Sequence, residues 1–343
     1  MRKELLGVCV VLSLGVLSAC GKKDSTGTEP ESVQAVAEET MEQNTFEGTT
    51  ESTSEDSMVS EETATPEPEM TTVYFETKDT TYGADGKVSY WYETEYDANG
   101  NQTKWATHNG DGTVDGWYEY EYDTNGNQTR CTSYSGDGTV EWRYEYEFDE
   151  DGNQTKFTSY DADGKTTGWG EYECDANENI VKCTSYDADG VVSGWSETKY
   201  DSEGNELNHT SYNADGTKNE WYESEYDTNG NVIKNSYSFF ADGELSGWSE
   251  HEYDANGNEI KSTDYEADGT FGSSSISEYD ANGNKIKTIY FYMDADTVNS
   301  WTVYEHDSNG NEIKRSFFNG DGSNNGWAET EYIAIEVPKE QKH

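Results

Sequence analysis

The chain has 343 residues, of which 71 are acidic and 22 basic, giving a formal charge of −49. This charge argues against nucleic acids and anionic lipid surfaces as direct partners, because both would be repelled, and it leaves cationic partners, divalent metal ions and neutral glycans. Only 31% of the residues are apolar, but 13% are aromatic, so we expect packed or stacked rings to hold the fold.

The first twenty residues have the features of a bacterial export signal. Met1-Arg2-Lys3 is positively charged, and the apolar run from Leu5 to Leu17 is too short to span a bilayer. Leu17-Ser18-Ala19-Cys20 resembles the lipobox of bacterial lipoproteins. The resemblance implies a signal peptide over residues 1–19 and fatty acyl chains on Cys20, which would anchor the chain on the extracytoplasmic face of the cell membrane. The alternative is an ordinary secretory signal with a chance cysteine.

Residues 20–72 are predicted to form a disordered tether. Within them, residues 24–72 hold fourteen Asp or Glu, no Lys or Arg, and many Ser and Thr. Such a segment buries too little apolar surface to become ordered, and its charges repel one another. We therefore expect it to hold the rest of the chain away from the membrane.

Residues 73–332 are built from a repeat of 26 or 27 residues, of which Tyr122-Asp123-Thr124-Asn125-Gly126 is a sample. The first position of this motif recurs at Tyr96, Tyr122, Phe148, Cys174, Tyr200, Tyr226, Tyr253, Tyr279, His306 and Tyr332. Each unit holds two Thr- and aromatic-rich runs separated by Asp-Gly and Asn-Gly pairs, which predict two strands and two type I′ turns. We predict an all-β fold of nineteen or so strands in one antiparallel meander, followed by a short tail at 333–343.

The register can be tested within the sequence. A two-residue turn at Asn125-Gly126 pairs Glu121 with Arg130, and the same rule gives acid–base pairs in seven other units. Where Lys199 replaces the acid, Asn208 replaces the base, so a like-charge pair is avoided. This favours the two-residue turn over a three-residue loop with a bulge. Glu178 replaces one turn Gly, which predicts an irregular or strained turn.

Alternation divides the side chains between two faces. One face carries Trp117, Glu121 and Arg130, and the other carries Tyr122 and the Thr129 position. In later units that position is aliphatic, so the second face is the predicted core; the residues are Val181, Leu207, Ile233, Ile260, Ile286 and Ile313. One face of a single sheet must find cover. We expect a curled or spiral sheet, with a spiral or barrel-like shell lined by this face as the simplest form and a long twisted ribbon as the alternative.

The Tyr-Asp-x-x-Gly motif, followed by a Thr-rich strand and a further Gly turn, resembles the YD (RHS) repeats of bacterial surface and toxin proteins. The resemblance covers about 260 residues, 73–332, and implies a continuous sheet wound into a hollow shell. Only eleven residues follow Tyr332, so we expect no encapsulated toxin domain. A weaker resemblance connects the Gly, Trp and Tyr near the turns with MORN-like repeats and with choline- or glucan-binding cell-wall repeats.

Tryptophan recurs five residues before the first position of the motif. The row consists of Trp91, Trp117, Trp169, Trp195, Trp221, Trp248, Trp301 and Trp327. Units lie two strands apart, so successive rings would be about 9–10 Å apart, close to the length of a disaccharide. Exposed rings beside carboxylates suit sugar stacking, and these eight residues are the candidate glycan contacts. The alternative is that Trp–Tyr pairs only hold neighbouring strands together.

Other patterns carry less chemistry. The Asp-rich turns lack the frame of a calcium loop, so we predict no cofactor or metal site, with weak calcium binding left open. A disulfide between Cys174 and Cys183 is possible but not expected. Enzyme motifs are absent, and paired Glu residues recur too often to be an active site. The prediction is a surface repeat lipoprotein that acts by binding, as an adhesion or glycan-binding module whose partner is an extracellular glycan or a surface protein. The alternatives are a structural spacer or shell without ligand, and a component of a toxin–immunity system.

Overall fold

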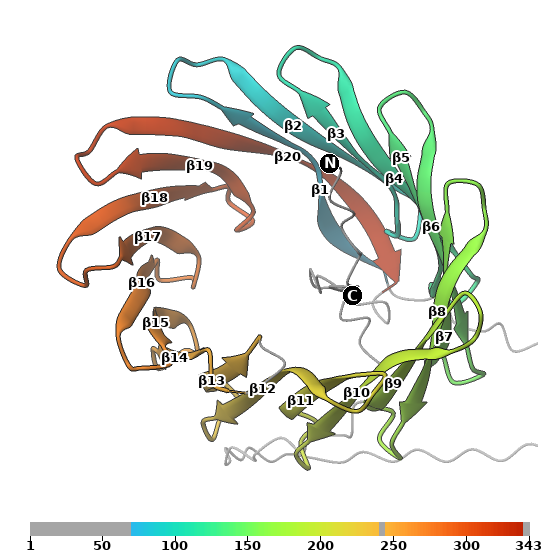
Figure 1. Cartoon of the computed structure of the whole chain (residues 1–343). Coiled ribbons are helices and arrows are strands. Elements are labelled where there is room, and N and C mark those ends of the chain that lie inside the picture. The colour runs from blue at the N-terminus through green and yellow to red at the C-terminus, as the bar shows by residue number, and fades with distance from the viewer. Residues whose placement is uncertain (1–69, 240–243, 339–343) are drawn as a thin grey trace, which may run out of the picture. The chain divides into compact units, whose positions relative to one another are not determined.

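The computed structural model describes residues 70–239 and 244–338, which form one antiparallel sheet of twenty strands. The strands are β1 (Met70–Tyr82), β2 (Val88–Tyr96), β3 (Gln102–Asn109), β4 (Val114–Tyr122), β5 (Gln128–Ser135), β6 (Val140–Phe148), β7 (Gln154–Asp161), β8 (Thr166–Cys174), β9 (Ile180–Asp187), β10 (Val192–Tyr200), β11 (Glu206–Asn213), β12 (Lys218–Tyr226), β13 (Val232–Ser238), β14 (Gly247–Tyr253), β15 (Glu259–Glu266), β16 (Phe271–Tyr279), β17 (Lys285–Tyr292), β18 (Val298–His306), β19 (Glu312–Asn319) and β20 (Asn324–Pro338). Each strand pairs with the next along the chain, which confirms the predicted meander (Figure 1). No helix long and apolar enough to cross a membrane occurs in these residues.

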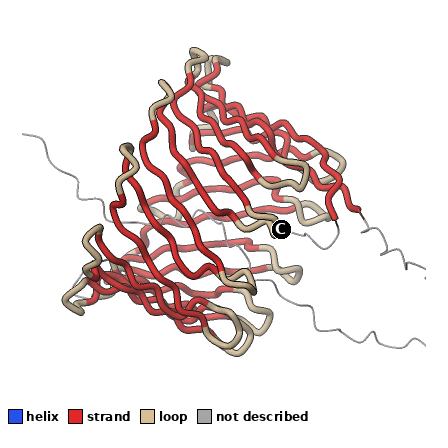
Figure 2. Tube along the Cα trace, turned by 90° about the vertical axis from the view of Figure 1, so that its right-hand side faces the viewer, coloured by secondary structure: helices blue, strands red, loops and turns tan. Residues whose placement is uncertain are grey.

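The two terminal strands close the sheet. β1 pairs with β20 from Met70 opposite Pro338 to Tyr82 opposite Trp327. The strands therefore form a closed barrel, in agreement with the barrel-like shell that was the simplest expected form, whereas an open curled or spiral sheet and a twisted ribbon are wrong (Figures 1 and 2). Residues 70–72, predicted to belong to the tether, pair with residues 336–338 of the predicted tail, and residues 333–335 of that tail pair with residues 73–75, so both segments lengthen the terminal strands. Closure satisfies the backbone groups that two free edges would expose.

The turns differ from the predicted type I′ form. In the loop after β4, the Gly126 amide donates to the Asp123 carbonyl at 3.3 Å, and the Asp123 amide donates to the Asn127 carbonyl at 2.9 Å. Gly126 has a φ of +88°, but Asn125 does not have the positive φ that a type I′ turn requires. The loop is therefore a type I turn followed by a left-handed Gly, with three residues between the closing pair.

A bulge next to this loop explains why the predicted charge pairs are nevertheless correct. Tyr122 lies opposite Gln128, while Glu121 lies opposite Arg130, so Thr129 is the extra residue. The Thr129 hydroxyl donates to the Glu121 carbonyl at 3.2 Å. Relative to a two-residue turn, the three-residue loop shifts the pairing by one residue, and the extra residue of the bulge shifts it back. Glu121 and Arg130 therefore lie opposite each other, as they would after a two-residue turn. Lys199 also lies opposite Asn208, as predicted.

Glu178 adopts the left-handed conformation of the Gly that it replaces, with a φ of +69°. Its loop keeps the regular hydrogen bonds, since the Glu178 amide donates to the Asp175 carbonyl at 3.1 Å and the Asp175 amide to the Asn179 carbonyl at 2.9 Å. The predicted strain is confirmed, whereas the loop itself is regular.

We expect Glu178→Gly to be more stable than Glu178→Ala by about 1 kcal/mol in the free energy of unfolding. Both variants remove the same side chain, but only Gly relieves the left-handed strain. Urea unfolding followed by tryptophan fluorescence measures the difference. Gly204, which has a φ of +86° in the next such loop, provides the control, because Gly204→Ala should lose a similar amount. Equal midpoints for the two Glu178 variants would contradict the explanation.

The barrel wall has an inner and an outer face. Burial raises the pKa of Tyr122 to about 12 and raises the pKa values of Tyr120 and Tyr146 further. Burial also raises the pKa of Tyr134 on the opposite face, but less strongly. Side chains converge on the concave side of a closed sheet and diverge on its convex side. We therefore assign the Tyr122 face to the inside of the barrel and the Trp117 face to the outside.

The predicted aliphatic core does not form. The Thr129 position is a bulge, and four of its aliphatic counterparts are 37–40% exposed, namely Leu207, Ile233, Ile286 and Ile313. The buried apolar side chains of the described residues are few, and most are small: Ala106, Cys131, Ala328 and Val337. The barrel is held instead by its backbone ladders and by polar and ring contacts between strands.

The tyrosine of the motif makes one of these contacts in most units. The Tyr122 hydroxyl at the end of β4 donates to the Gln102 carbonyl at the start of β3, at 2.8 Å. The same bond, at 2.7–3.0 Å, is made by Tyr96, Tyr200, Tyr226, Tyr253, Tyr279 and Tyr332. This side chain therefore ties each strand end to the preceding strand.

Candidate functional site

The eight predicted Trp residues are all half-buried on the outer face. Trp117 stacks on Tyr134 of the next strand, with 5.0 Å between ring centroids and 11° between the planes. Similar stacks, 4.7–5.4 Å apart, are Trp91–His108, Trp169–Tyr186, Trp195–Tyr212, Trp248–Tyr265, Trp301–Phe318 and Trp327–Tyr82. Trp221 lies opposite Ser238. These stacked pairs follow one another around the barrel, and we call them the aromatic girdle.

Trp117 is also held on its other sides. Its indole nitrogen donates to the Glu119 carboxylate at 3.1 Å, and the Lys104 ammonium lies 5.4 Å from the ring centroid. The far edge of the ring lies over Gly138, where an added Cβ would be 3.7 Å from the indole. Lysines also cover Trp91, Trp248 and Trp327. In these four units both faces of the indole ring have a partner.

The lysines before Trp169 and Trp195 are engaged elsewhere. Lys156 pairs with Glu147 at 3.4 Å, and Lys182 pairs with Glu173 at 3.0 Å. No Lys or Arg in the described part of the chain lies over Trp169 or Trp195 in a cation–ring contact. These two rings stack on one side only, as Trp301 does on Phe318, but they also lie in neighbouring repeats, which makes them the best-placed pair for an outside ligand.

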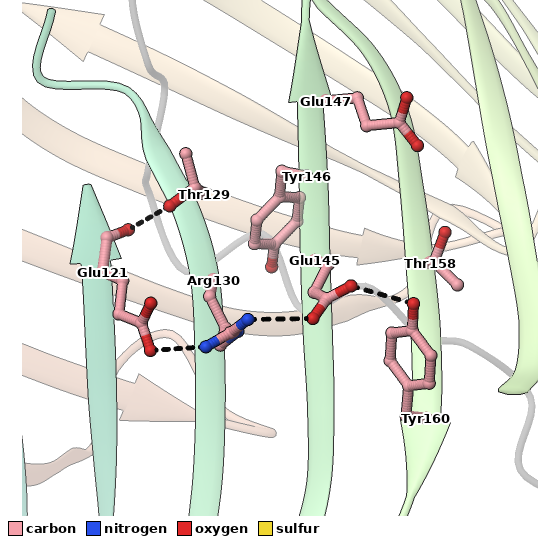
Figure 3. A pocket seen from close by; sticks show the side chains of 8 residues that line it. All are labelled: Glu121, Thr129, Arg130, Glu145, Tyr146, Glu147, Thr158 and Tyr160. Carbon is pink, nitrogen blue, oxygen red and sulfur yellow. Dashed lines mark hydrogen bonds and ion pairs between the residues drawn. The ribbon is translucent and has the colours of Figure 1, made fainter. Parts of the chain in front are cut away.

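The girdle changes composition at β6, where Arg143 takes the place of Trp. The Arg143 guanidinium lies 4.3 Å from the centroid of the Tyr160 ring. A cation–ring contact therefore replaces the Trp stack of most other units. Beside it, Arg130 bridges Glu121 at 2.8 Å and Glu145 at 3.2 Å, and the Tyr160 hydroxyl donates to Glu145 at 2.9 Å. These contacts form a row that runs from Glu121 on β4 through Arg130 on β5 and Glu145 on β6 to Tyr160 on β7, as Figure 3 shows.

A shallow hollow of about 250 Å³ lies at this row, with Thr158 and Glu147 on its far side. Burial raises the pKa of Glu145, but the Tyr160 hydrogen bond, the charge of Arg143 and the Arg130 contact outweigh it, so the pKa is lowered overall. The hollow is thus lined by the Arg130 guanidinium and by the carboxylates of Glu121, Glu145 and Glu147. The sequence prediction missed it, although the replacement of a repeated Trp by Arg143 was a visible signal.

The turn aspartates bind their own loops. One oxygen of Asp227 accepts hydrogen bonds from the amides of Asn229 at 2.8 Å and Asn231 at 2.9 Å, and the other accepts one from the Asn231 side chain at 2.9 Å. The side-chain bond from Asn231, followed by its backbone bond, lowers the pKa of Asp227. Within residues 70–239 and 244–338, no group of three or more His, Cys, Asp or Glu is placed to hold a metal ion.

Of the cysteines, the candidate lipid site Cys20 lies outside the described residues. Cys131, Cys174 and Cys183 are free thiols, and Cys131 is buried. Cys174 lies opposite Ile180, while Cys183 lies opposite Tyr172, so the two are diagonal neighbours in one hairpin.

The comparisons with known proteins give limited matches. A model for a protein family of unknown function, DUF2963, matches residues 247–290 and 272–316. A search of curated proteins found no match to the chain. Among solved structures, a Tc holotoxin pore of Photorhabdus luminescens is 13% identical over 71% of this chain and 16% of its own, with a TM-score of 0.30.

Two further structures illustrate the range of these matches. A TcdB2–TccC3 complex is 13% identical over 67% of this chain and 16% of its own, with a TM-score of 0.29. A porin-like protein from Bacteroides uniformis is 12% identical over 76% of this chain and 97% of its own, with a TM-score of 0.37. The chain thus spans only 16% of the length of these toxin chains.

Proposed function

We propose that this protein is a lipid-anchored surface module of the YD-repeat type that binds neutral glycans along its aromatic girdle and catalyses no reaction. The observation that carries the proposal is the recurrence of half-buried Trp rings around the outer face, with Glu carboxylates beside several of them. Ring faces and carboxylates together offer the apolar and hydrogen-bonding contacts that a sugar needs. A neutral glycan also avoids the repulsion that the charge of −49 imposes on anions.

The contacts of the eight Trp rings support a smaller set of glycan contacts than all eight. Lysine covers Trp117, so a sugar would have to displace a cation before it could stack there. Trp169 and Trp195 need no such displacement, and they follow one another in neighbouring repeats. We therefore infer that glycan binding depends most on this pair.

A glycan array probed with the purified protein tests the proposal. We expect neutral oligosaccharides to bind, and Trp195→Ala to weaken binding about three- to ten-fold through loss of ring contact. Trp117→Ala is the matched control, because it removes a ring that is already covered and should change affinity less. If no glycan binds, or if both variants bind as tightly as the wild type, the girdle serves only to hold strands together. The protein would then be a spacer or shell.

The proposed anchor has its own test. Cells given a labelled fatty acid should incorporate the label into the wild-type protein, whereas Cys20→Ala should receive none, because the thioether requires that thiol. Cys131→Ala is the control, since this buried cysteine lies in the barrel wall. Label retained in Cys20→Ala would contradict the anchor.

A further inference from the structure

Within the described residues, one arc of the inner face carries a continuous series of contacting rings. From β2 to β8, contacting rings run in series, with 4.9 Å between the Tyr92 and Trp105 centroids and 5.6 Å from Tyr118 to each of Trp105 and Trp142. Tyr144 continues the series from Trp142 to Phe157, which contacts Tyr172 at 5.9 Å. These side chains, Tyr92, Trp105, Tyr118, Trp142, Tyr144, Phe157 and Tyr172, are called the inner aromatic wall.

The fold does not require this wall. At the same register on β10 to β18, the inner positions are mostly small and polar, as at Ser224, Ser277 and Thr288. Their hydroxyls pair across strands, with Ser224 donating to Asn235 at 2.8 Å and Ser277 lying 3.3 Å from Thr288. The same strand geometry is thus built with hydroxyls in one arc and with half-exposed rings in the other. Large half-exposed rings grouped in one place are typical of a binding surface.

The inner aromatic wall carries no charged side chain, but it lies next to three carboxylates, those of Glu76, Asp79 and Glu312, which we call the Glu76 edge. The inner residue Asp79 of β1 lies opposite Tyr92 in the sheet and binds Arg315 at 2.8 Å. Arg315 also binds Glu312 at 3.1 Å, so one cation faces two carboxylates. Glu76 adds a third carboxylate; its enclosure by the barrel and then the charge of Asp79 raise its pKa. One Asp79 oxygen is buried without a hydrogen-bond donor, so the edge remains short of positive charge.

Cations already lie over rings on the outside of this protein, as Lys104 does over Trp117 and Arg143 over Tyr160. No Lys or Arg of the described chain makes such a contact with Trp105, Tyr118 or Trp142. The inner wall is therefore a row of π faces beside an excess of carboxylates, and these three rings lack the cation that covers Trp91, Trp117, Trp248 and Trp327 on the outer face. An organic cation gains from both features, because ring faces and carboxylates attract it together.

We propose that the inner aromatic wall and the neighbouring Glu76 edge bind a linear aliphatic polyamine. Its methylene segments would lie along Tyr92, Trp105 and Tyr118, with one ammonium group over the rings and another beside Glu76. A twenty-stranded closed sheet with strands about 4.8 Å apart is about 30 Å across at the backbone, which leaves room for such a chain between side chains. The site is independent of the outer girdle.

Isothermal titration calorimetry of the full chain with spermidine at low salt tests the proposal. We expect saturable binding, and we expect Trp105→Leu to weaken it about three- to thirty-fold while Trp105→Phe retains most of it, because Phe keeps the π face. Glu76→Gln should weaken binding by a similar factor. The control Trp195→Leu removes a ring from the outer face and should leave the affinity unchanged. Thermal melting of each variant shows whether it folds.

Two competing ligands decide which feature is recognised. The diol 1,6-hexanediol has a methylene chain without charge, and Mg²⁺ has charge without a chain, so neither should match spermidine. Equal binding of Mg²⁺, with Trp105→Leu unaffected, would show only the diffuse attraction of an acidic protein and would overturn the proposal. Equal binding of the diol would overturn the role of the cation. Loss of glycan binding in Trp195→Ala leaves the polyamine site unaffected, so the two proposals fail separately.

Discussion

Acidification from about pH 5 to about pH 2 is expected to unfold the barrel in one steep transition. Hydrogen bonds within the turns lower the pKa values of sixteen aspartates, those of Asp85, Asp97, Asp111, Asp123, Asp137, Asp149, Asp175, Asp201, Asp215, Asp227, Asp254, Asp268, Asp280, Asp294, Asp307 and Asp321. A lowered pKa in the folded state means that the folded chain binds fewer protons than the unfolded chain. Each such group contributes stability above the unfolded pKa of about 3.9, and that stability is lost as the pH falls through the folded value.

The number of linked groups makes the transition steep, because many protons are taken up together. An opposing effect precedes it, since protonation of Glu residues relieves the repulsion within a chain of charge −49, so stability should first rise slightly below neutral pH. Near-ultraviolet circular dichroism recorded against pH follows the loss of ordered rings.

Asp137 provides the control, because hydrogen bonds from Thr139 and Ser135 lower its pKa to about 2. Asp137→Asn should be less stable than the wild type at neutral pH. That difference should shrink as the pH approaches 2 and the wild-type carboxylate is protonated. A difference that stays constant across this range would show that the turn carboxylates do not govern acid unfolding.

The second large effect is expected at the seam where β1 meets β20. Asp79 is 2% exposed, and one of its oxygens accepts from Arg315 at 2.8 Å and from Thr330 at 3.0 Å. Arg315→Ala leaves this buried carboxylate without its cation, which typically costs about 3–5 kcal/mol of unfolding free energy. Because the seam closes the barrel, urea unfolding should show a lower midpoint for the whole protein.

The adjacent residue provides a matched control. Lys314 pairs with Glu329 at 3.8 Å, and both side chains are more than one-third exposed, Lys314 at 35% and Glu329 at 49%. Lys314→Ala should therefore cost at most about 1 kcal/mol. Combining Asp79→Thr with Arg315→Thr removes both charges and should recover much of the stability that Arg315→Ala loses. If Arg315→Ala unfolds within error of Lys314→Ala, the buried pair does not hold the seam.

The repeat period alone was sufficient to predict the strands, their order and the pairs of charged residues. These features depend on neighbours within one hairpin, as in Glu121 opposite Arg130 or Trp117 opposite Tyr134. The same local pattern predicted the row of eight tryptophans. It could not distinguish a type I turn with a bulge from a type I′ turn, because both give the same pairing, and only the backbone angle at Asn125 separates them.

The candidate sites were predicted less completely. The Lys that covers Trp117 and the lysines that leave Trp169 and Trp195 uncovered sit at equivalent repeat positions, so sequence alone treats them alike. The inner aromatic wall has a signal in the sequence, since Trp105 and Trp142 interrupt positions that are small or polar in later repeats. Their proximity depends on the curvature of the sheet, which is a property of all the strands together.

The sequence by itself determined a meander of hairpins with two chemically different faces, because alternation and turn chemistry act over a few residues. Only the tertiary structure decided that the sheet closes, with the predicted Tyr122 face as the lining of a barrel. Closure joins Met70–Tyr82 to Asn324–Pro338, segments that contact across the whole length of the repeat domain. No local pattern specifies that pairing, because it exists only when the accumulated twist and tilt of twenty strands bring the two ends together.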